Sequence, residues 1–253
     1  MGVVNLTPDS FSGDGLGDDI EAAVVQARRL VAEGADIIDI GGESTRPGAE
    51  PVSVDEELRR VIPAIEKLAG ELSVPLSIDT YKSVVARRAI EAGARMINDV
   101  WGLKQDPELA KVAAEADVPI ILVSNQQDTL CYDIIAEVVS SLERSIRLAT
   151  QAGVAGHNII IDPGIGFGKS AEQNLEIIQR LAELRFLNRP ILLGTSRKFM
   201  PGQPFDQRLE ATAATVAIGI ANGADMVRVH EVQQMVQVCR MSDAIIRRRP
   251  IGD

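Results

Sequence analysis

The feature of this sequence that most constrains its fold is an eightfold alternation between a short apolar run and an amphipathic stretch. Strands are expected at residues 2–6, 36–40, 75–79, 95–99, 119–123, 158–162, 190–194 and 225–229. Between them, the spacing of apolar residues predicts helices such as residues 19–34, 54–70, 82–94 and 209–224, and several of these end in glycine. Strands that alternate with helices form parallel sheets, because each helix returns the chain to the start of the next strand.

Eight strand–helix units with right-handed crossovers close naturally into a (β/α)8 TIM barrel. The 253 residues fit one such domain, spanning residues 1–253. Hydrophobic residues make up 45% of the chain and aromatic residues only 3%, so the core is aliphatic, as is typical of parallel strands covered by helices. An open, doubly wound sheet is the alternative. It would have to hold eight parallel strands without closing, and no GxGxxG motif follows the first strand.

The charge balance and the apolar pattern indicate a small-molecule protein of the cytoplasm. The formal net charge is −10, so there is no excess of Lys and Arg to bind nucleic acid or a membrane surface. No apolar run approaches the roughly 18 residues of a membrane span, and we expect no signal peptide. The two cysteines, Cys131 and Cys239, lie far apart without a redox or metal-binding spacing.

Polar residues gather just after the carboxyl ends of the expected strands. They are Asn5, residues 41–46, Asp79, Thr80, Asn98, Asp99, Ser124, Asn125, Asp162, residues 196–198, Arg228 and His230. In a barrel these strand ends meet at one mouth, where active sites of this fold lie. Any one of these residues could be a solvent contact or a helix cap, but hydrogen-bonding groups at every strand end favour a site.

Asp79, Asn98 and Asp162 end the third, fourth and sixth expected strands. Each carboxylate accepts two parallel hydrogen bonds, which suits a flat heterocycle with amidine-like N–H donors. Glycines alternate with other residues in the segment 162–169, and they would let a ligand lie against the main chain. The alternative for Asp162 is a helix cap or an ion pair with Lys198.

Cationic side chains form a second group at the same mouth. The candidates to hold a diphosphate and stabilise its charge as it departs are Arg46, Lys198, Arg228 and His230. Arg228 and His230 alternate on one strand and therefore share a face, whereas Val229 points the other way. Arg197 is expected in a surface ion pair, and His157 precedes the sixth strand at the opposite end of the barrel, where we expect a structural role.

The sequence contains no motif for a permanent metal ion. It has no HExxH motif, no cysteine cluster and no carboxylate triad. Asn5 could hold Mg²⁺ only if the phosphates of a ligand supplied the rest of the coordination shell.

Seven motifs, in order along nearly the whole chain, resemble the signatures of the bacterial dihydropteroate synthases. They are NLTPDSFS (5–12), GGESTRPG (41–48), SIDT (77–80), IND (97–99), DPGIGFGK (162–169), SRK (196–198) and RVH (228–230). The resemblance implies a pterin-binding barrel enzyme that condenses 6-hydroxymethyl-7,8-dihydropterin diphosphate with p-aminobenzoate. The products are 7,8-dihydropteroate and diphosphate, on the folate pathway. The resemblance also implies that the carbon–oxygen bond breaks first and that the pterin ring stabilises the resulting cation.

The same resemblance implies a role for individual residues. Pterin contacts fall on Asp79, Asn98, Val100, Asp162 and Lys198. The p-aminobenzoate contacts fall on Thr45, Pro47, Phe167 and Ser196. Diphosphate contacts fall on Asn5, Thr45, Arg46, Arg228 and His230, with Mg²⁺ at Asn5, and catalysis falls on Asp79, Lys198, Arg228 and His230. The resemblance further implies a homodimer formed through the later helices.

Two alternative functions remain open from the residues. A pterin-dependent methyltransferase would share the Asp79, Asn98 and Asp162 set, but it has no need of a diphosphate clamp. A non-catalytic pterin-binding barrel would keep the pocket without turnover. Formation of product from the two substrates separates these readings.

Overall fold

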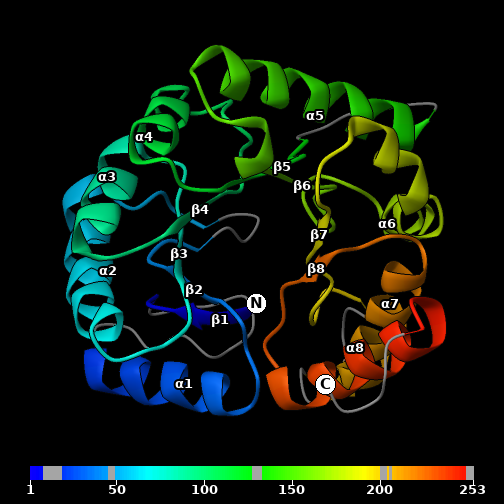
Figure 1. Ribbon diagram of the computed structural model, residues 1–253, viewed down its shortest axis with the longest axis horizontal. Coiled ribbons are helices and arrows are strands. Elements are labelled where there is room, and N and C mark those ends of the chain that lie inside the picture. Colours follow the sequence, from blue (N-terminus) through cyan, green and yellow to red (C-terminus); the bar gives the residue numbers. More distant parts are fainter. Residues whose placement is uncertain (8–18, 45–48, 127–132, 200–203, 205–206, 249–253) are drawn as a thin grey trace.

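The computed structural model describes residues 1–7, 19–44, 49–126, 133–199, 204 and 207–248. Within these ranges the strands are β1 (Gly2–Asn5), β2 (Ile38–Gly41), β3 (Leu76–Asp79), β4 (Met96–Asp99), β5 (Ile120–Val123), β6 (Ile159–Asp162), β7 (Leu192–Leu193) and β8 (Met226–Val227). The helices are α1 (Ile20–Ala32), α2 (Val54–Ala69), α3 (Ser83–Ala92), α4 (Glu108–Ala116), α5 (Ile134–Gln151), α6 (Ala171–Gln179), α7 (Leu209–Ala221) and α8 (Val232–Ile246), with short 3₁₀ helices η1 (Gly156–Asn158) and η2 (Leu181–Leu187). The helices form a ring outside the strands (Figure 1).

The strands form a closed barrel. β1 to β6 make one parallel sheet in chain order, and β7 pairs with β8. An isolated parallel bridge between Ile161 and Ile191 joins these two sheets on one side, and a bridge between Gly2 and Val229 joins them on the other. The backbone N–H of Val229 donates to the carbonyl of Met1 at 3.0 Å across the second seam. The predicted TIM barrel is confirmed, and the open sheet is excluded.

Every expected strand is present to within a few residues. β1 to β6 match their predicted ranges closely. β7 and β8 each contain two residues where we expected five, because their ladders to β6 and β1 are reduced to the isolated bridges. The barrel therefore depends on its first six strands for most of its regular pairing.

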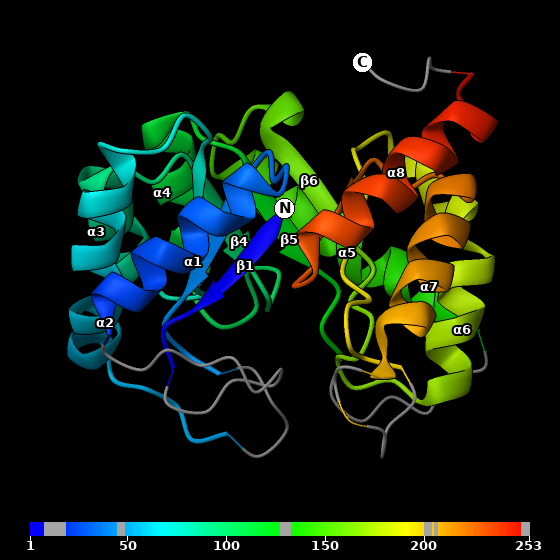
Figure 2. The same cartoon turned by 90° about the horizontal axis from the view of Figure 1, so that it is seen from below.

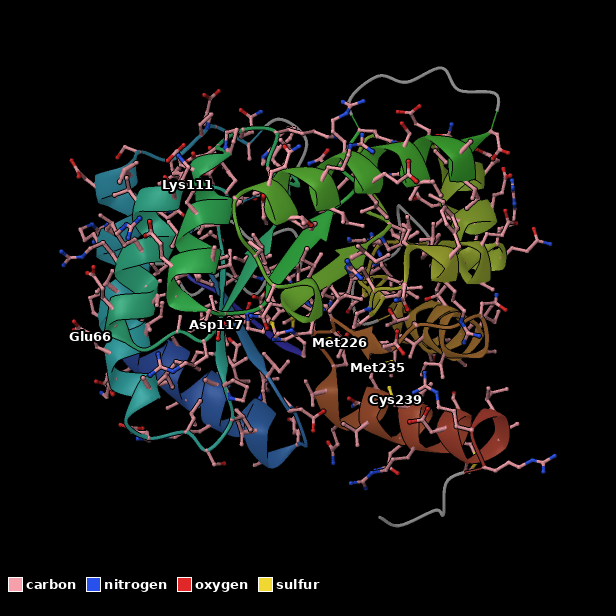
Figure 3. All side chains as sticks on the ribbon, turned by 45° about the horizontal axis from the view of Figure 1, so that its top comes forward. Glu66, Lys111, Asp117, Met226, Met235 and Cys239 are labelled. Carbon is pink, nitrogen blue, oxygen red and sulfur yellow. The ribbon has the colours of Figure 1, made fainter. Side chains whose placement is uncertain are left out.

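Alternate residues along each strand face opposite sides, and this separates two regions of the core. Outward side chains such as Ile40, Ile78 and Ile97 pack against the helices in one large cluster. Inward side chains form a distinct apolar cluster inside the barrel, made of Met1, Met96, Ile121, Val123, Ile160 and Leu192, with Ile37, Phe167 and Met226 against it. In Figure 3, Met226, the first residue of β8, lies near the middle of the molecule, whereas the exposed side chains of Glu66 and Lys111 lie on the outer helices.

Polar side chains fix where several helices begin. Asp19 accepts a hydrogen bond from the backbone N–H of Ala22 at the start of α1, and Ser53 does the same for Glu56 at the start of α2. Ser170 forms a reciprocal capping box with Gln173 at the start of α6. Caps of this kind satisfy N–H groups that have no partner within the helix. In the described part of the chain, no helix is both long and apolar enough to cross a membrane.

The turn after β4 packs tightly against the end of β5. Gly102 has φ +57°, and a Cβ atom at this position would lie 2.7 Å from the carbonyl oxygen of Val123 and 2.9 Å from Oγ of Ser145. The Ser145 hydroxyl also donates to the carbonyl of Gly102 at 2.7 Å. Only glycine fits this backbone conformation and this close approach without strain.

We expect Gly102→Ala to lower the free energy of unfolding by about 1–3 kcal/mol, because the new methyl group overlaps a backbone carbonyl that cannot move alone. Urea denaturation measures the change. The matched control is Gly70→Ala at the end of α2, where φ is −83° and nothing crowds the position within 3.9 Å. There we expect stability to be unchanged or higher by about 0.4–1 kcal/mol. Equal effects of the two substitutions would contradict the packing argument.

Candidate active site

The inward positions at the carboxyl ends of the strands bring the predicted polar residues together. The register pairs Gly41 with Asp79, Asp79 with Asn98, and Val123 with Asp162. Because the strands are parallel and each of these residues lies at or next to the end of its strand, they meet at the same mouth of the barrel. Asn98 is 2% exposed and Asp162 is 6% exposed, so both are nearly removed from water before any ligand binds.

Arg228 connects three strands across the barrel. Its Nε donates to Oδ2 of Asp39 at 2.6 Å, and its Nη2 donates to Oδ2 of Asp79 at 2.7 Å. The carboxylates hold the pKa of the guanidinium above its usual range, although burial opposes this. The predicted cation that follows β8 therefore lies between two carboxylates, one of which, Asp79, was predicted to contact a pterin. Asp39 itself was missed by the sequence analysis.

The side-chain amide of Asn98 is held by the same buried carboxylate. Nδ2 of Asn98 donates to Oδ2 of Asp39 at 3.0 Å. Among the described residues, neither Oδ1 of Asn98 nor Oδ1 of Asp39 has a hydrogen-bond partner, although both are buried. A buried polar atom without a partner is unusual, and in a binding site it indicates a place for a ligand's donor.

Asp162 and the glycines that follow it form a compact loop. The Asp162 Oδ1 accepts from the backbone N–H of Gly164 at 2.6 Å, so one carboxylate oxygen orders the turn. Gly164 has φ +74°, and a Cβ there would lie 2.1 Å from the carbonyl oxygen of Ser124. The ammonium of Lys169 binds the carbonyls of Ser124, at 2.6 Å, and Gly164, at 2.9 Å. The loop is thus fixed against the end of β5. The tight turn requires glycine at Gly164, and the bare backbone would also let a ligand lie against the main chain.

Lys198 reaches across this loop. Its ammonium donates to the carbonyl of Ile165 at 2.7 Å and lies 4.7 Å from the centre of the Phe167 ring. Burial lowers the pKa of Lys198 to about 8, and the nearby Asp162 carboxylate opposes this fall. The structure therefore brings together a residue expected to contact the pterin and one expected to contact p-aminobenzoate.

Burial also perturbs the carboxyl groups of the site. It raises the pKa of Asp79 to about 7, because desolvation of the charged form outweighs the attraction of Arg228. Burial likewise raises the pKa of Asp162, and there the charge of Lys198 is the largest opposing effect. Strongly shifted carboxyl groups in a barrel mouth are typical of functional sites.

Ser196 and His230 meet at the rim formed by β7 and β8. Oγ of Ser196 lies 2.9 Å from Nδ1 of His230. The guanidinium of Arg197 binds Glu231, with Nε 2.5 Å from Oε1. The predicted ion pair of Arg197 is confirmed, but its side chain is only 17% exposed, so the pair is not on the open surface. Val229, 3% exposed, packs in the outer core as expected.

A mostly buried ionic cluster that the sequence analysis missed joins residues on either side of the segment 44–51. The ammonium of Lys82 binds the carboxylates of Glu43 and Glu57, and it donates to the carbonyl of Val52 at 2.5 Å. Oε1 of Glu43 also accepts from the hydroxyl of Tyr81 at 3.1 Å. Contacts from one side chain to Glu43 and Val52 hold both ends of the segment that carries the predicted Thr45, Arg46 and Pro47. Those three residues lie outside the described ranges.

The remaining predicted residues occupy the ends of β1, β4 and β6. Val100 is buried directly after β4, beside a turn in which Asp99 accepts from the backbone N–H groups of Trp101, at 2.9 Å, and Leu103, at 2.6 Å. Asn5 ends β1 and is half-buried. His157 is exposed in η1, at the opposite end of the barrel from Asp162.

The described residues offer few ligands for a metal ion. They contain no group of three or more His, Cys, Asp and Glu residues that could hold one. Asn5 supplies a single amide oxygen, whereas Mg²⁺ prefers six oxygen ligands. Asn5 therefore fits Mg²⁺ only if the ion arrives bound to phosphate, which would supply the other oxygens.

Comparison with known proteins agrees with this geometry. A family model described as pterin binding enzyme matches residues 1–230. The dihydropteroate synthase of Bacillus subtilis strain 168 is 49% identical over 252 residues, which cover 98% of this chain and 88% of that protein.

Solved structures show the same similarity. A dihydropteroate synthase from Clostridium difficile, crystallised in the presence of pteroic acid, superposes with a TM-score of 0.91 at 48% identity and covers 98% of this chain and 96% of its own. The enzyme from Xanthomonas albilineans with 4-aminobenzoic acid gives a TM-score of 0.91 at 42% identity, covering 99% and 93%. The chain therefore belongs to the pterin-binding enzymes and, among them, to the dihydropteroate synthases, which are transferases of folate biosynthesis.

Proposed function

We propose that this site condenses 6-hydroxymethyl-7,8-dihydropterin diphosphate with p-aminobenzoate, and that the residues of the barrel mouth divide this work between them. The observation that carries the proposal is a set of hydrogen-bond acceptors at the barrel mouth, from Asn98 and Asp162, which are buried, and from Asp79, whose side chain is 14% exposed. A pterin ring presents several N–H donors on one flat edge, and carboxylate and amide oxygens match them. Pteroic acid and 4-aminobenzoic acid, named with the related structures, are a pterin conjugate and the second substrate.

Lys198 and Phe167 place the two substrates side by side in this proposal. Lys198 is cationic at pH 7, because its pKa of about 8 lies above that pH. Its contacts with the loop carbonyl of Ile165 and the Phe167 ring support a role for its charge beside both proposed pockets. Ser196, in contact with His230, then contributes to the p-aminobenzoate pocket from the facing rim.

The leaving diphosphate is assigned to Asn5, Thr45, Arg46, Arg228 and His230. Arg228 brings positive charge to the site directly after β8, and His230 lies on the same face of the chain, where its ring nitrogens can hydrogen-bond a phosphate. Mg²⁺ held between Asn5 and the phosphates would supply charge neutralisation of the leaving group. An aniline amine is unprotonated at neutral pH, so positioning and electrostatic stabilisation carry the catalysis without a strong general base.

Product formation tests the function directly. The purified protein, given pterin diphosphate, p-aminobenzoate and Mg²⁺, should form dihydropteroate.

Asp162→Asn should weaken pteroic-acid binding by about 10–100-fold in calorimetry, because an amide leaves buried N–H groups of the ligand facing a donor. Asp36→Asn is the control, since Asp36 is exposed at the amino end of β2. Binding without turnover would support the non-catalytic alternative, and unchanged affinity in Asp162→Asn would contradict the pterin assignment.

Binding should also depend on pH through Asp79. Below its pKa of about 7 the group carries a proton and presents an O–H donor, whereas above that pH it is an acceptor for ligand N–H groups. We therefore expect pteroic-acid affinity to rise about tenfold from pH 6 to pH 8. Isothermal titration across this range measures the profile. Asp79→Asn should flatten it, and a flat profile in the wild type would mean that Asp79 does not titrate in the site.

The homodimer is part of the same proposal. Six of the eight exposed large hydrophobic residues among those described lie on α6, η2, α7 and α8, namely Leu175, Phe186, Ile218, Met241, Ile245 and Ile246. Figure 2 shows α6, α7 and α8 side by side at one flank of the barrel. Exposed apolar side chains gathered on neighbouring helices favour a protein interface.

Analytical ultracentrifugation tests the dimer. We expect the wild type to sediment as a dimer and Ile245→Asp to shift it toward the monomer, because a buried unpaired charge is costly at an interface. Val25→Asp is the matched control, since Val25 is 62% exposed but lies on α1, away from this flank. A monomeric wild type would refute the dimer without affecting the assigned reaction.

A further inference from the structure

Asp39 is a fully buried carboxylate that joins two residues of the site. It lies on β2, two residues before the strand end, and its side chain is 0% exposed. A single oxygen, Oδ2, accepts from Nδ2 of Asn98 at 3.0 Å and from Nε of Arg228 at 2.6 Å. Asp39 is therefore a shared anchor for one neutral and one cationic side chain.

The contact with Asp39 decides which end of the Asn98 amide is offered to a ligand. A carboxylate can only accept hydrogen bonds, so it must face the NH₂ end of the amide. The carbonyl end, Oδ1, is then left over, and it is buried without a partner among the described residues. With the amide turned the other way, two oxygens would face each other in a buried site. The geometry consequently makes Asn98 an acceptor.

The same carboxylate fixes the guanidinium of Arg228. Because Oδ2 of Asp39 accepts a hydrogen bond from Nε, the guanidinium is oriented so that its Nη2 donates to Oδ2 of Asp79 at 2.7 Å. Asp39 thus acts on both side chains from beneath the site, with its own surface covered.

We propose that Asp39 is a positioning residue that determines the donor and acceptor pattern of the pterin pocket. Through Asn98 it completes a set of acceptors with Asp79 and Asp162, which selects a ring edge rich in N–H donors over one that presents acceptors. Through Arg228 it keeps the guanidinium at the level of Asp79. This inference rests on the proposed function, since it concerns the ligand of the same pocket.

The test is a double-mutant cycle, read by calorimetric titration with pteroic acid. Asp39→Ala should weaken binding at least tenfold, because the Asn98 amide can then turn its NH₂ group toward the ligand's donors. In an Asn98→Ala background the same substitution should cost less than threefold, because only the action of Asp39 through Arg228 is then left to lose. Asp39→Asn, whose amide oxygen can still accept from Asn98, should restore part of the lost affinity.

Ser77→Ala is the matched control. Ser77 is the register partner of Asp39 on β3, is 0% exposed, and its Oγ has no partner among the described residues. This control should keep pteroic-acid affinity within twofold. In all folded variants, the KM for p-aminobenzoate at saturating pterin diphosphate should also stay within twofold, because that pocket lies across the mouth at Phe167 and Ser196.

The possible outcomes distinguish failure of the Asp39 role from failure of the proposed function. Affinity within twofold of wild type in folded Asp39→Ala would overturn the positioning role, as would independent, multiplying losses from Asp39→Ala and Asn98→Ala. If Asp39→Ala does not fold, the same comparison is made with Asp39→Leu, which also removes the acceptor but fills more of the space, and an additive cycle with Asn98→Ala would overturn the role there too. A wild-type protein that does not bind pteroic acid would refute the proposed function itself, and this inference with it.

Discussion

The pairing of Arg228 with two carboxylates, one fully buried and one mostly buried, is the interaction on which the site depends. A guanidinium placed alone inside the barrel would carry a large desolvation cost, and so would either carboxylate. Nε binds Asp39 and Nη2 binds Asp79, so the three charges are compensated together across β8, β2 and β3. The same contacts hold the last strand in place relative to the second and third, although β8 itself has only two residues of regular pairing.

Much of this arrangement could be predicted from the sequence, because the period of apolar residues and the position of strand ends are local properties. Asp79, Asn98 and Asp162 follow directly from the rule that strand ends of a barrel converge. Asp39 could not be found this way, because it lies within its strand, and only the observation that an acidic residue interrupts the apolar run 37–40 at an inward position would have shown it.

The ionic cluster of Lys82 was hidden for another reason. Its members come from three separate segments, at Glu43, Glu57 and Lys82, and each alone reads as an ordinary helix or loop charge. Their meeting depends on how α2 packs beside β3, which a single sequence does not reveal. Burial raises the pKa of Glu57, with Lys82 as the main opposing influence, so the cluster is held together against a real desolvation cost.

The apolar floor inside the barrel has a consequence for the balance of charge above it. Met96, Ile121 and Ile160 close the barrel below the polar residues, so water cannot screen those charges from beneath. The central polar group contains three carboxyl groups, from Asp39, Asp79 and Asp162, against two cations, from Lys198 and Arg228. Between the pKa of Asp79, about 7, and that of Lys198, about 8, and with Asp39 and Asp162 ionised, the group has one negative charge in excess. In the proposed reaction, positive charge that develops on the pterin ring as diphosphate departs would be stabilised by this excess negative charge. The neutral substrate would be stabilised less.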